Sequence, residues 1–194
     1  MPVPYVIEDS DTSKERVYDL YSRLLKDRIV FIGEEFTYGL ANSIVAQLLF
    51  LEADDAERDI IIYINSGGGL VTSCMAIYDV MNYVKPDVST VCVGEAGSAA
   101  GFILAAGAKN KRYALKNAKI MLHQVSSGAE GTVEDMKISI REAERANDLM
   151  MSEISKITGK PFEQVKKDLD RDYYLSAEEA KKYGLIDDIL TNRE

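Results

Sequence analysis

Histidine and cysteine are scarce in this sequence of 194 residues, which contains one histidine and two cysteines. A zinc site draws its ligands mainly from these two residue types, and His123, Cys74 and Cys92 do not have zinc-ligand spacing. Two cysteines make no disulfide framework, and Cys92 is interpreted as a small buried residue in an apolar run. No calcium-loop pattern occurs, although a site of carboxylates alone stays open. We therefore expect no metal ion and a reducing cytoplasm.

An excess of basic residues and a long apolar segment are also lacking. The formal net charge is -9, which disfavours a nucleic-acid partner because phosphate contacts need clustered lysine and arginine. No apolar run is long enough to span a bilayer. Residues 1–5 lack the charged and apolar regions of a signal peptide. These absences predict a cytoplasmic protein that binds neither nucleic acid nor membrane.

What the sequence does contain is a repeated strand–turn–helix pattern, which predicts one α/β domain over residues 1–194. Residues 59–65 form a β-branched run typical of a strand buried on both faces. We expect a mobile arm at residues 1–12 and a first helix from about Thr12. The other expected strands are 28–33, 88–94, 119–123 and 185–190, and the other expected helices are 40–51, 70–84, 98–106, 132–157, 161–169 and 177–183.

The longest expected helix begins after Thr132 and ends at about Ile157. Asp135, three residues after Thr132, completes a variant of the capping box, and Ser176 with Glu179 forms another. The apolar stripe of the long helix is narrow, which is typical of a helix that leaves its domain to meet another helix.

Ser98 follows a buried strand, within the small residues 96–100, at the start of a helix. A nucleophile elbow needs this kind of sharp turn with small neighbours, and a helix start supplies N–H groups suited to an oxyanion. The competing interpretation is an ordinary serine N-cap, which this segment alone favours.

His123 ends a strand, where sites in parallel sheets gather. Histidine is the usual general base for serine, although a lone histidine is more often structural. Asp172, in the 170–174 stretch before a capped helix, is a candidate for the carboxylate that orients the histidine. With 32 acidic residues in the chain, the pattern leaves this choice open.

Residues 66–69, Ser-Gly-Gly-Gly, allow a backbone to approach a ligand closely. They predict an oxyanion donor, a strip that pairs with an extended peptide, or simply a tight turn. A phosphate cradle is excluded, because no Gly-Lys-Ser/Thr follows and the Gly-x-Gly-x-x-Gly pattern fails at Thr72.

Taken together, these segments resemble ClpP, the proteolytic subunit of the bacterial Clp protease. The matching stretches follow in order over nearly the whole chain: 5–8, 21–29, 41–51, 63–66, 85–90, 104–108, 123–124, 171–172 and 175–177. The resemblance implies a crotonase-like α/β spiral. It also implies two stacked seven-subunit rings, with the helix at 132–157 making the contact between the rings.

The resemblance further implies a site. Ser98 would be the nucleophile, His123 the base and Asp172 the orienting acid, with the backbone N–H groups of Gly68 and Ala99 as oxyanion donors. Extended polypeptide substrates would pair with four residues, Gly69, Leu70, Val71 and Thr72. Contacts across the rings would come from Gln124, Asp170 and Arg171. Peptide-bond cleavage itself needs no cofactor.

The implied partner is a hexameric AAA+ unfoldase of the ClpX, ClpA or ClpC type, which would use ATP, since no nucleotide motif occurs here. Its loops would dock in an apolar cleft formed by Leu49, Phe50, Ile61, Tyr63, Tyr83, Val91, Tyr113 and Leu190.

Four positions depart from the pattern that the resemblance implies. Gly67 and Val125 stand where proline is usual, and Glu95 and Ala99 replace the methionines that flank the nucleophile. These departures suggest a divergent paralogue. Two alternatives therefore stay open: a catalytically weak or scaffold subunit that completes a mixed ring with a second ClpP paralogue, and a crotonase-like enzyme acting on acyl-CoA.

Overall fold

The computed structural model describes residues 3–8 and 16–192. The elements follow in this order: β1 (Tyr5–Glu8), β2 (Arg16–Asp19), α1 (Leu20–Lys26), β3 (Ile29–Ile32), α2 (Tyr38–Asp54), β4 (Ile60–Ser66), α3 (Val71–Tyr83), β5 (Val88–Gly97), α4 (Ala99–Ala105), β6 (Arg112–Leu115), β7 (Lys119–Leu122), α5 (Val133–Thr158), α6 (Phe162–Asp168), β8 (Tyr173–Ser176), α7 (Ala177–Tyr183) and β9 (Asp188–Leu190). The predicted α/β class is confirmed.

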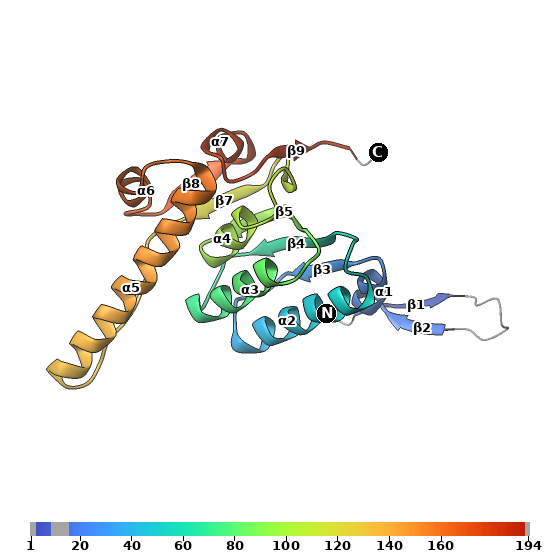
Figure 1. The fold of residues 1–194 in the computed structure, drawn as a ribbon, viewed down its shortest axis with the longest axis horizontal. Coiled ribbons are helices and arrows are strands. Elements are labelled where there is room, and N and C mark those ends of the chain that lie inside the picture. Colours follow the sequence, from blue (N-terminus) through green and yellow to red (C-terminus); the bar gives the residue numbers. More distant parts are fainter. Residues whose placement is uncertain (1–2, 9–15, 193–194) are drawn as a thin grey trace.

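A parallel sheet in the order β3-β4-β5-β6-β9 forms the body. Helices α2, α3 and α4 connect its first four strands and lie on one face of the sheet (Figure 1). Ile60, Ile62 and Ile64 of β4 are fully buried in the core. The alternate residues Ile61 and Tyr63 are only partly buried and Asn65 is exposed. Strand β4 is therefore buried on one face only, and the expected burial on both faces is wrong, because the helices cover one face of the sheet.

Strand β5 divides the sheet in two. Its first half pairs with β6 and its last three residues pair with β7. Between these halves β5 contains two more residues than β4, and Gly94 has φ 89°. The Glu95 N–H donates to Asn65 Oδ1 at 3.2 Å. This bulge redirects the end of β5, so that Ser98 follows directly beside β7.

Helix α5 is the long helix that the sequence predicts. Thr132 and Asp135 form the predicted capping box, and the helix ends at Gly159 with φ 69°. Figure 1 shows it extending well beyond the sheet. Its exposed apolar side chains include Val133, Ile138, Ile140 and Leu149. In the part of the chain that the structure describes, no helix is both long and apolar enough to cross a membrane.

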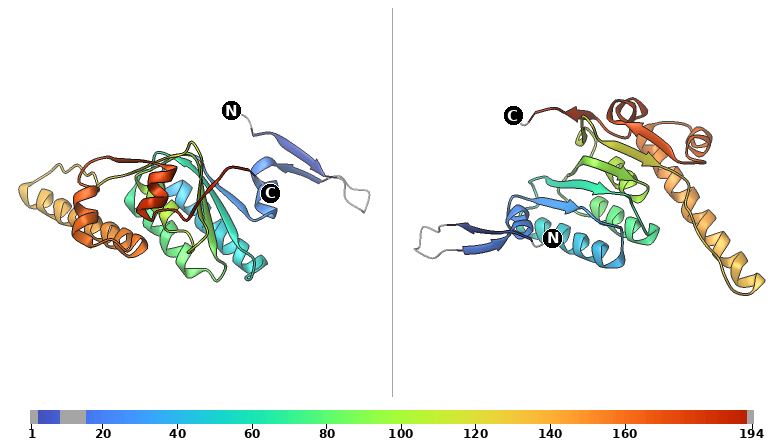
Figure 2. Two further views of the ribbon diagram at one scale, coloured as in Figure 1. Left: turned by 90° about the horizontal axis from the view of Figure 1, so that it is seen from above. Right: turned by 180° about the vertical axis from the view of Figure 1, so that it is seen from behind.

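The N-terminal prediction needs correction. Residues 1–2 and 9–15, which include Thr12, lie outside the described residues, but Tyr5–Glu8 form β1, paired antiparallel with β2. The first helix begins only at Leu20, because Arg16–Asp19 bond to β1 and Asp19 accepts the Ser22 N–H at 3.0 Å as an N-cap. The two strands project from the body as a hairpin (Figure 2).

Two strands of the main sheet are missing from the sequence prediction. Strand β6 lies between the predicted elements, and β8 occupies part of the stretch interpreted as a loop. Strand β8 pairs antiparallel with β7. Four-residue strands carry little periodicity, so their existence depends on the partner strand rather than on their own sequence.

Candidate active site

Ser98 lies in a strained turn between β5 and α4. Its φ of 51° and ψ of -119° are unusual for a residue with a side chain, and they match the sharp turn of a nucleophile elbow. Its N–H donates to Met121 O at 2.8 Å. Ser98 is the N-cap residue of α4, but its side chain makes no capping hydrogen bond. The hydroxyl is therefore available for another partner.

Small residues let the glycine strip, residues 67–69, approach this turn. A Cβ on Gly97 would lie 3.0 Å from Gly67 O, and a Cβ on Gly101 would lie 2.8 Å from Met121 O. Gly68 has φ 102°, and a Cβ there would lie 2.7 Å from Gly97 O. The glycines are thus required by close backbone approach as well as by conformation.

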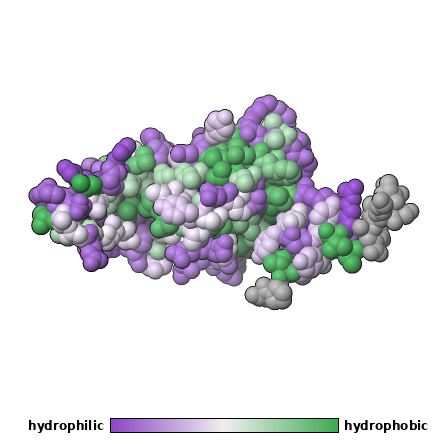
Figure 3. Space-filling model, turned by 90° about the horizontal axis from the view of Figure 1, so that it is seen from below, coloured by the Kyte–Doolittle hydropathy of each residue, from purple (hydrophilic) through white to green (hydrophobic). Residues whose placement is uncertain are grey.

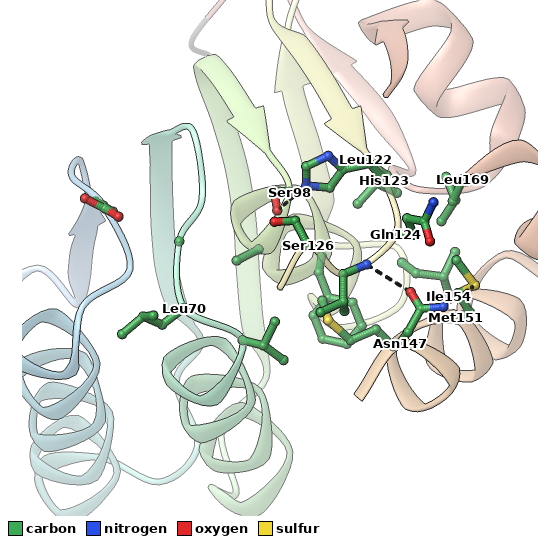
Figure 4. A pocket seen from close by; sticks show the side chains of 17 residues that line it. Leu70, Ser98, Leu122, His123, Gln124, Ser126, Asn147, Met151, Ile154 and Leu169 are labelled. Carbon is green, nitrogen blue, oxygen red and sulfur yellow. Dashed lines mark hydrogen bonds between the residues drawn. The ribbon is translucent and has the colours of Figure 1, made fainter. Parts of the chain in front are cut away.

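The partner of the Ser98 hydroxyl is His123. Ser98 Oγ and His123 Nε2 are 2.9 Å apart (Figure 4). On the other side of the ring, His123 Nδ1 lies 2.8 Å from Asp172 Oδ1. Strand pairing explains the meeting. Gly97 pairs with Met121 across β5 and β7, so the residues that follow both strands are neighbours. Leu122 pairs with Tyr173 across β7 and β8, which places Asp172 opposite His123.

This hydrogen-bonded chain has the order needed for nucleophilic catalysis. A carboxylate at Nδ1 holds that nitrogen in its N–H form, which leaves Nε2 free to accept a proton from the hydroxyl. The Ser98–His123 separation is within the range for proton transfer in a general-base step. Hydroxyl, imidazole and carboxylate thus lie in line at one end of the sheet.

An apolar cleft of about 320 Å³ opens beside Ser98 and His123. Its walls come from α3, α4, α5 and the residue that follows α6, as Figure 4 shows. The apolar lining residues are Leu70, Val71, Phe102, Leu122, Val125, Met150, Met151, Ile154 and Leu169. The contributions of α5 were not predicted as site residues, because helical spacing shows which residues share a face but not which cavity they line.

The family model of the Clp proteases matches residues 12–193, which is most of the chain. The chain belongs to the Clp protease family. The α/β architecture, with its seven helices and mixed strand pairing over the described residues, agrees with the fold expected for that family.

In this Clp protease family member the two expected oxyanion donors differ in state. The N–H of Ala99 is at the start of α4, where first-turn N–H groups have no partner within the helix. The N–H of Gly68 donates to Ser66 Oγ at 3.1 Å, and the Ser66 hydroxyl donates to Glu34 O at 2.7 Å. Gly68 lies beside Ser98, but its N–H group is already hydrogen-bonded to Ser66 Oγ and so is not free to bind an oxyanion.

The expected four-residue substrate strip is wrong at its second half. Gly69 forms an isolated parallel bridge with Phe36. Leu70 is the N-cap of α3, and Val71 and Thr72 belong to the first helical turn. Because the Cys74 N–H already donates to Leu70 O at 3.0 Å, extended backbone ends at Leu70.

Hydrogen bonds hold the two residues after His123, Gln124 to the segment that follows α6 and Val125 to α5. The Gln124 N–H donates to Leu169 O at 2.7 Å, and its side chain donates to Asp170 O at 2.7 Å. The Val125 N–H donates to Asn147 Oδ1 of α5 at 2.9 Å (Figure 4). A proline at position 125, as the family resemblance implies, would have no N–H to give.

The residues expected between rings also lie near the site. Gln124 and Asp170 contact each other, and Arg171 Nε lies 3.8 Å from Asp170 Oδ2. The Arg171 side chain is 87% exposed. Within one chain, Arg171 is thus free to contact another molecule, and its role between rings stays a prediction.

The eight residues expected to form one docking cleft are divided between two places. Tyr63, Val91 and Leu190 line a groove of about 500 Å³ on the sheet. Leu49, Phe50 and Tyr83 are exposed on α2 and α3, the helices that cover the opposite face. Ile61 and Tyr113 are partly exposed on β4 and β6. Figure 3 shows apolar surface over the middle of the body. The chain by itself does not close a single cleft from these residues.

Neither cysteine offers a competing nucleophile. Cys74 and Cys92 are fully buried, and burial raises the pKa of both thiols, that of Cys92 to about 12. Across residues 3–8 and 16–192, no group of three or more histidine, cysteine or acidic side chains is arranged to hold a metal ion.

Proposed function

We propose that this member of the Clp protease family is a serine endopeptidase that cleaves extended polypeptides through an acyl-enzyme at Ser98. The observation that carries this proposal is the chain of hydrogen bonds from Ser98 through His123 to Asp172, at 2.9 and 2.8 Å. Its position on a strained elbow, at the mouth of an apolar cleft, supports the same function.

In the proposed reaction, Ser98 Oγ attacks the carbonyl carbon of the peptide bond while His123 Nε2 takes the hydroxyl proton. His123 then gives this proton to the leaving amine as the C–N bond breaks. Water, activated by the same imidazole, hydrolyses the acyl-enzyme and returns the proton to Ser98. Asp172 keeps the imidazole oriented and stabilises its charged form.

The oxyanion of the tetrahedral intermediate would accept hydrogen bonds from the N–H groups of Ala99 and Gly68. Each such donor contributes on the order of 3 kcal/mol to transition-state stabilisation. For Gly68 this requires an exchange, because its N–H donates to Ser66 Oγ in the structure. Substrate binding would displace the Ser66 hydroxyl from this N–H.

That engaged donor favours one alternative, a subunit with weak activity of its own. If Gly68 stays bonded to Ser66, only Ala99 stabilises the oxyanion. Hydrolysis would then be slower by about a hundredfold or more. A second copy or paralogue in the same ring, or a bound unfoldase, would have to release Gly68.

The proposed assembly consists of two stacked seven-subunit rings that receive polypeptides from a hexameric unfoldase. The exposed apolar residues of α5 support a contact between subunits, since such surface is costly in a monomer. The divided docking residues support side-by-side subunits, because two copies supply both halves of a cleft. Native mass spectrometry tests the assembly: a monomeric mass under conditions in which peptides are cleaved would contradict it.

Fluorophosphonate labelling with peptide mapping tests the nucleophile. The expected result is labelling at Ser98, and a loss of about a millionfold in fluorogenic-peptide hydrolysis by Ser98→Ala. Ser126→Ala is the matched control, because Ser126 lines the same cleft. Retained hydrolysis by Ser98→Ala would sink the proposed mechanism. An unlabelled protein, alone or with an unfoldase, would favour a scaffold role.

A further inference from the structure

We propose that Glu35 makes the cleft select substrates with a basic side chain close to the scissile bond. This inference rests on the proposed peptidase function and specifies its substrates. Neither the sequence patterns nor the family resemblance singles out Glu35.

Glu35 is the one carboxylate among the residues that line the cleft of Ser98 and His123. It also lines a neighbouring groove of about 420 Å³ that follows Gly67, Gly68 and Gly69. Within the described parts of the chain its side chain has no ion pair, and only its backbone carbonyl is hydrogen-bonded. A free carboxylate therefore faces the space in which an extended peptide would lie.

The contact between Glu35 and Gly69 places that carboxylate more closely. A Cβ on Gly69 would lie 3.0 Å from Glu35 Cγ and 2.6 Å from Phe36 N. The Phe36 backbone and the Glu35 side chain thus lie on the side to which a side chain of residue 69 would project. Because residue 69 is glycine, the Glu35 side chain can lie directly against its backbone.

The free edge of Gly69 fixes how a peptide would meet Glu35. Phe36 uses the carbonyl of Gly68 and the N–H of Leu70, each at 2.9 Å. Backbone groups alternate between the two edges of an extended segment, so those of Gly69 point away from Phe36. A peptide paired with this edge would lie along the groove that Glu35 lines, and its residue opposite Gly69 would be the one closest to Glu35.

That side chain would therefore meet the carboxylate of Glu35. Lysine or arginine there would form an ion pair, whereas glutamate would be repelled. For a partly exposed pair the expected preference is about fivefold in kcat/KM over glutamine, and it weakens with salt.

The test compares peptides with an apolar residue before the scissile bond and a single lysine, glutamine or glutamate at each flanking position. The lysine preference is expected at one flanking position in the wild type. It is expected to vanish in Glu35→Gln and to reverse in Glu35→Lys. Glu34→Gln is the matched control, since Glu34 carries the same charge one residue away but does not line the cleft of Ser98 and His123.

The lysine preference is the ratio of two kcat/KM values measured on the same protein sample. A lower fraction of active or folded protein changes both values equally and leaves the ratio unchanged. Peptide affinity in the Ser98→Ala background, measured by fluorescence anisotropy, gives the same comparison without catalysis. A protein that hydrolyses no peptide but still binds lysine peptides more tightly through Glu35 would contradict the peptidase and keep the charge selection. An unchanged preference in Glu35→Gln, or an equal loss in Glu34→Gln, would overturn the inference.

Discussion

The three residues of the hydrogen-bonded chain are exposed to different degrees. The His123 side chain is 26% exposed and that of Asp172 is 53% exposed. The Asp172–His123 hydrogen bond thus lies close to solvent, where water competes for the carboxylate. Ser98, by contrast, is held by a strained backbone and by the bond of its N–H to Met121. The histidine is therefore the residue whose orientation depends most on its surroundings.

Asp172→Asn tests this dependence at the residue scale. The amide can donate its NH2 group to Nδ1, which favours the wrong imidazole tautomer, and it carries no charge to stabilise the imidazolium. We therefore expect kcat for peptides to fall by about ten thousandfold. Steady-state kinetics measure the change. Asp170→Asn is the control from the same loop, since the Gln124 side chain bonds chiefly to its backbone carbonyl. Equal activity of Asp172→Asn and wild type would show that Asp172 does not orient the base.

Gly68→Ala tests the close approach of the glycine strip to Ser98. The new Cβ would lie within 2.9 Å of Ser98 Cβ and Ala99 N, and φ at Gly68 is 102°. The backbone must shift, so we expect fluorophosphonate labelling of Ser98 to fall by at least a hundredfold. Gly128→Ala, where nothing lies within 4 Å, is expected to label like the wild type. Normal labelling of Gly68→Ala would contradict the expected oxyanion geometry.

At the scale of elements, the site depends on how β7 is held between its neighbours. Strand β7 takes a parallel partner in β5 and an antiparallel partner in β8. Beyond β7 the chain continues along α5, where the bond from Val125 to Asn147 fastens it. The long helix is thereby linked to the segment that carries His123. A shift of α5 would move one wall of the cleft and the base together.

Asn147→Ala tests this link. Loss of one hydrogen bond of about 1 kcal/mol is expected to lower Tm by about 3 °C and to speed amide exchange at Val125. Asn147→Asp keeps an acceptor for the Val125 N–H and should restore slow exchange. Val125→Pro should lose the same bond. Fast exchange in Asn147→Asp, or unchanged exchange in Asn147→Ala, would count against the link.

At the scale of the whole molecule, one ion pair fastens the C-terminal segment to the sheet. Arg112, at the start of β6, donates through Nη2 to Asp187 Oδ1 at 2.6 Å and through Nε to Asp187 Oδ2 at 2.9 Å. It also donates to Gly184 O at 3.1 Å. The Arg112 side chain is 10% exposed, so without Asp187 its charge would be left nearly buried.

Asp187→Asn is therefore expected to reduce the free energy of unfolding by about 2 kcal/mol, measured by urea denaturation at pH 7. Asp188→Asn is the control, because Asp188 pairs with Lys181 at the exposed surface and its loss should cost less than about 1 kcal/mol. Equal losses in both variants would show that the buried ion pair stabilises the fold no more than the exposed one.

The pH dependence of the same pair follows from the pKa of Asp187. Burial alone raises this pKa, but hydrogen bonds from the Arg112 side chain and backbone outweigh it and hold the pKa below its ordinary 3.8. A carboxylate with a depressed folded-state pKa contributes stability above its unfolded pKa and loses it as pH falls through the folded value. The difference in stability between wild type and Asp187→Asn should thus be constant at neutral pH and shrink below about pH 4.

Local sequence was sufficient for several features. The β-branched run at 59–65 and the capping boxes at Thr132 and Ser176 predicted their elements closely, because each depends on neighbours a few residues away. The small residues around Ser98 indicated a tight turn, but this segment alone favoured a serine N-cap over a nucleophile elbow. The N-terminal helix was misplaced, because residues 16–19 obtain their hydrogen bonds from a strand earlier in the chain.

The sequence by itself thus determined the α/β class, the long capped helix, a tight turn at Ser98 and the strand that leads to His123. Only the tertiary structure decided which acid faces His123, because Asp172 is placed by the pairing of β7 with β8, whose register is not readable from local pattern. It also decided that Gly68 donates to Ser66, that the strip ends at Leu70 and that the Glu35 side chain lies against Gly69. Each of these depends on contacts between segments far apart in the chain, which no local preference encodes.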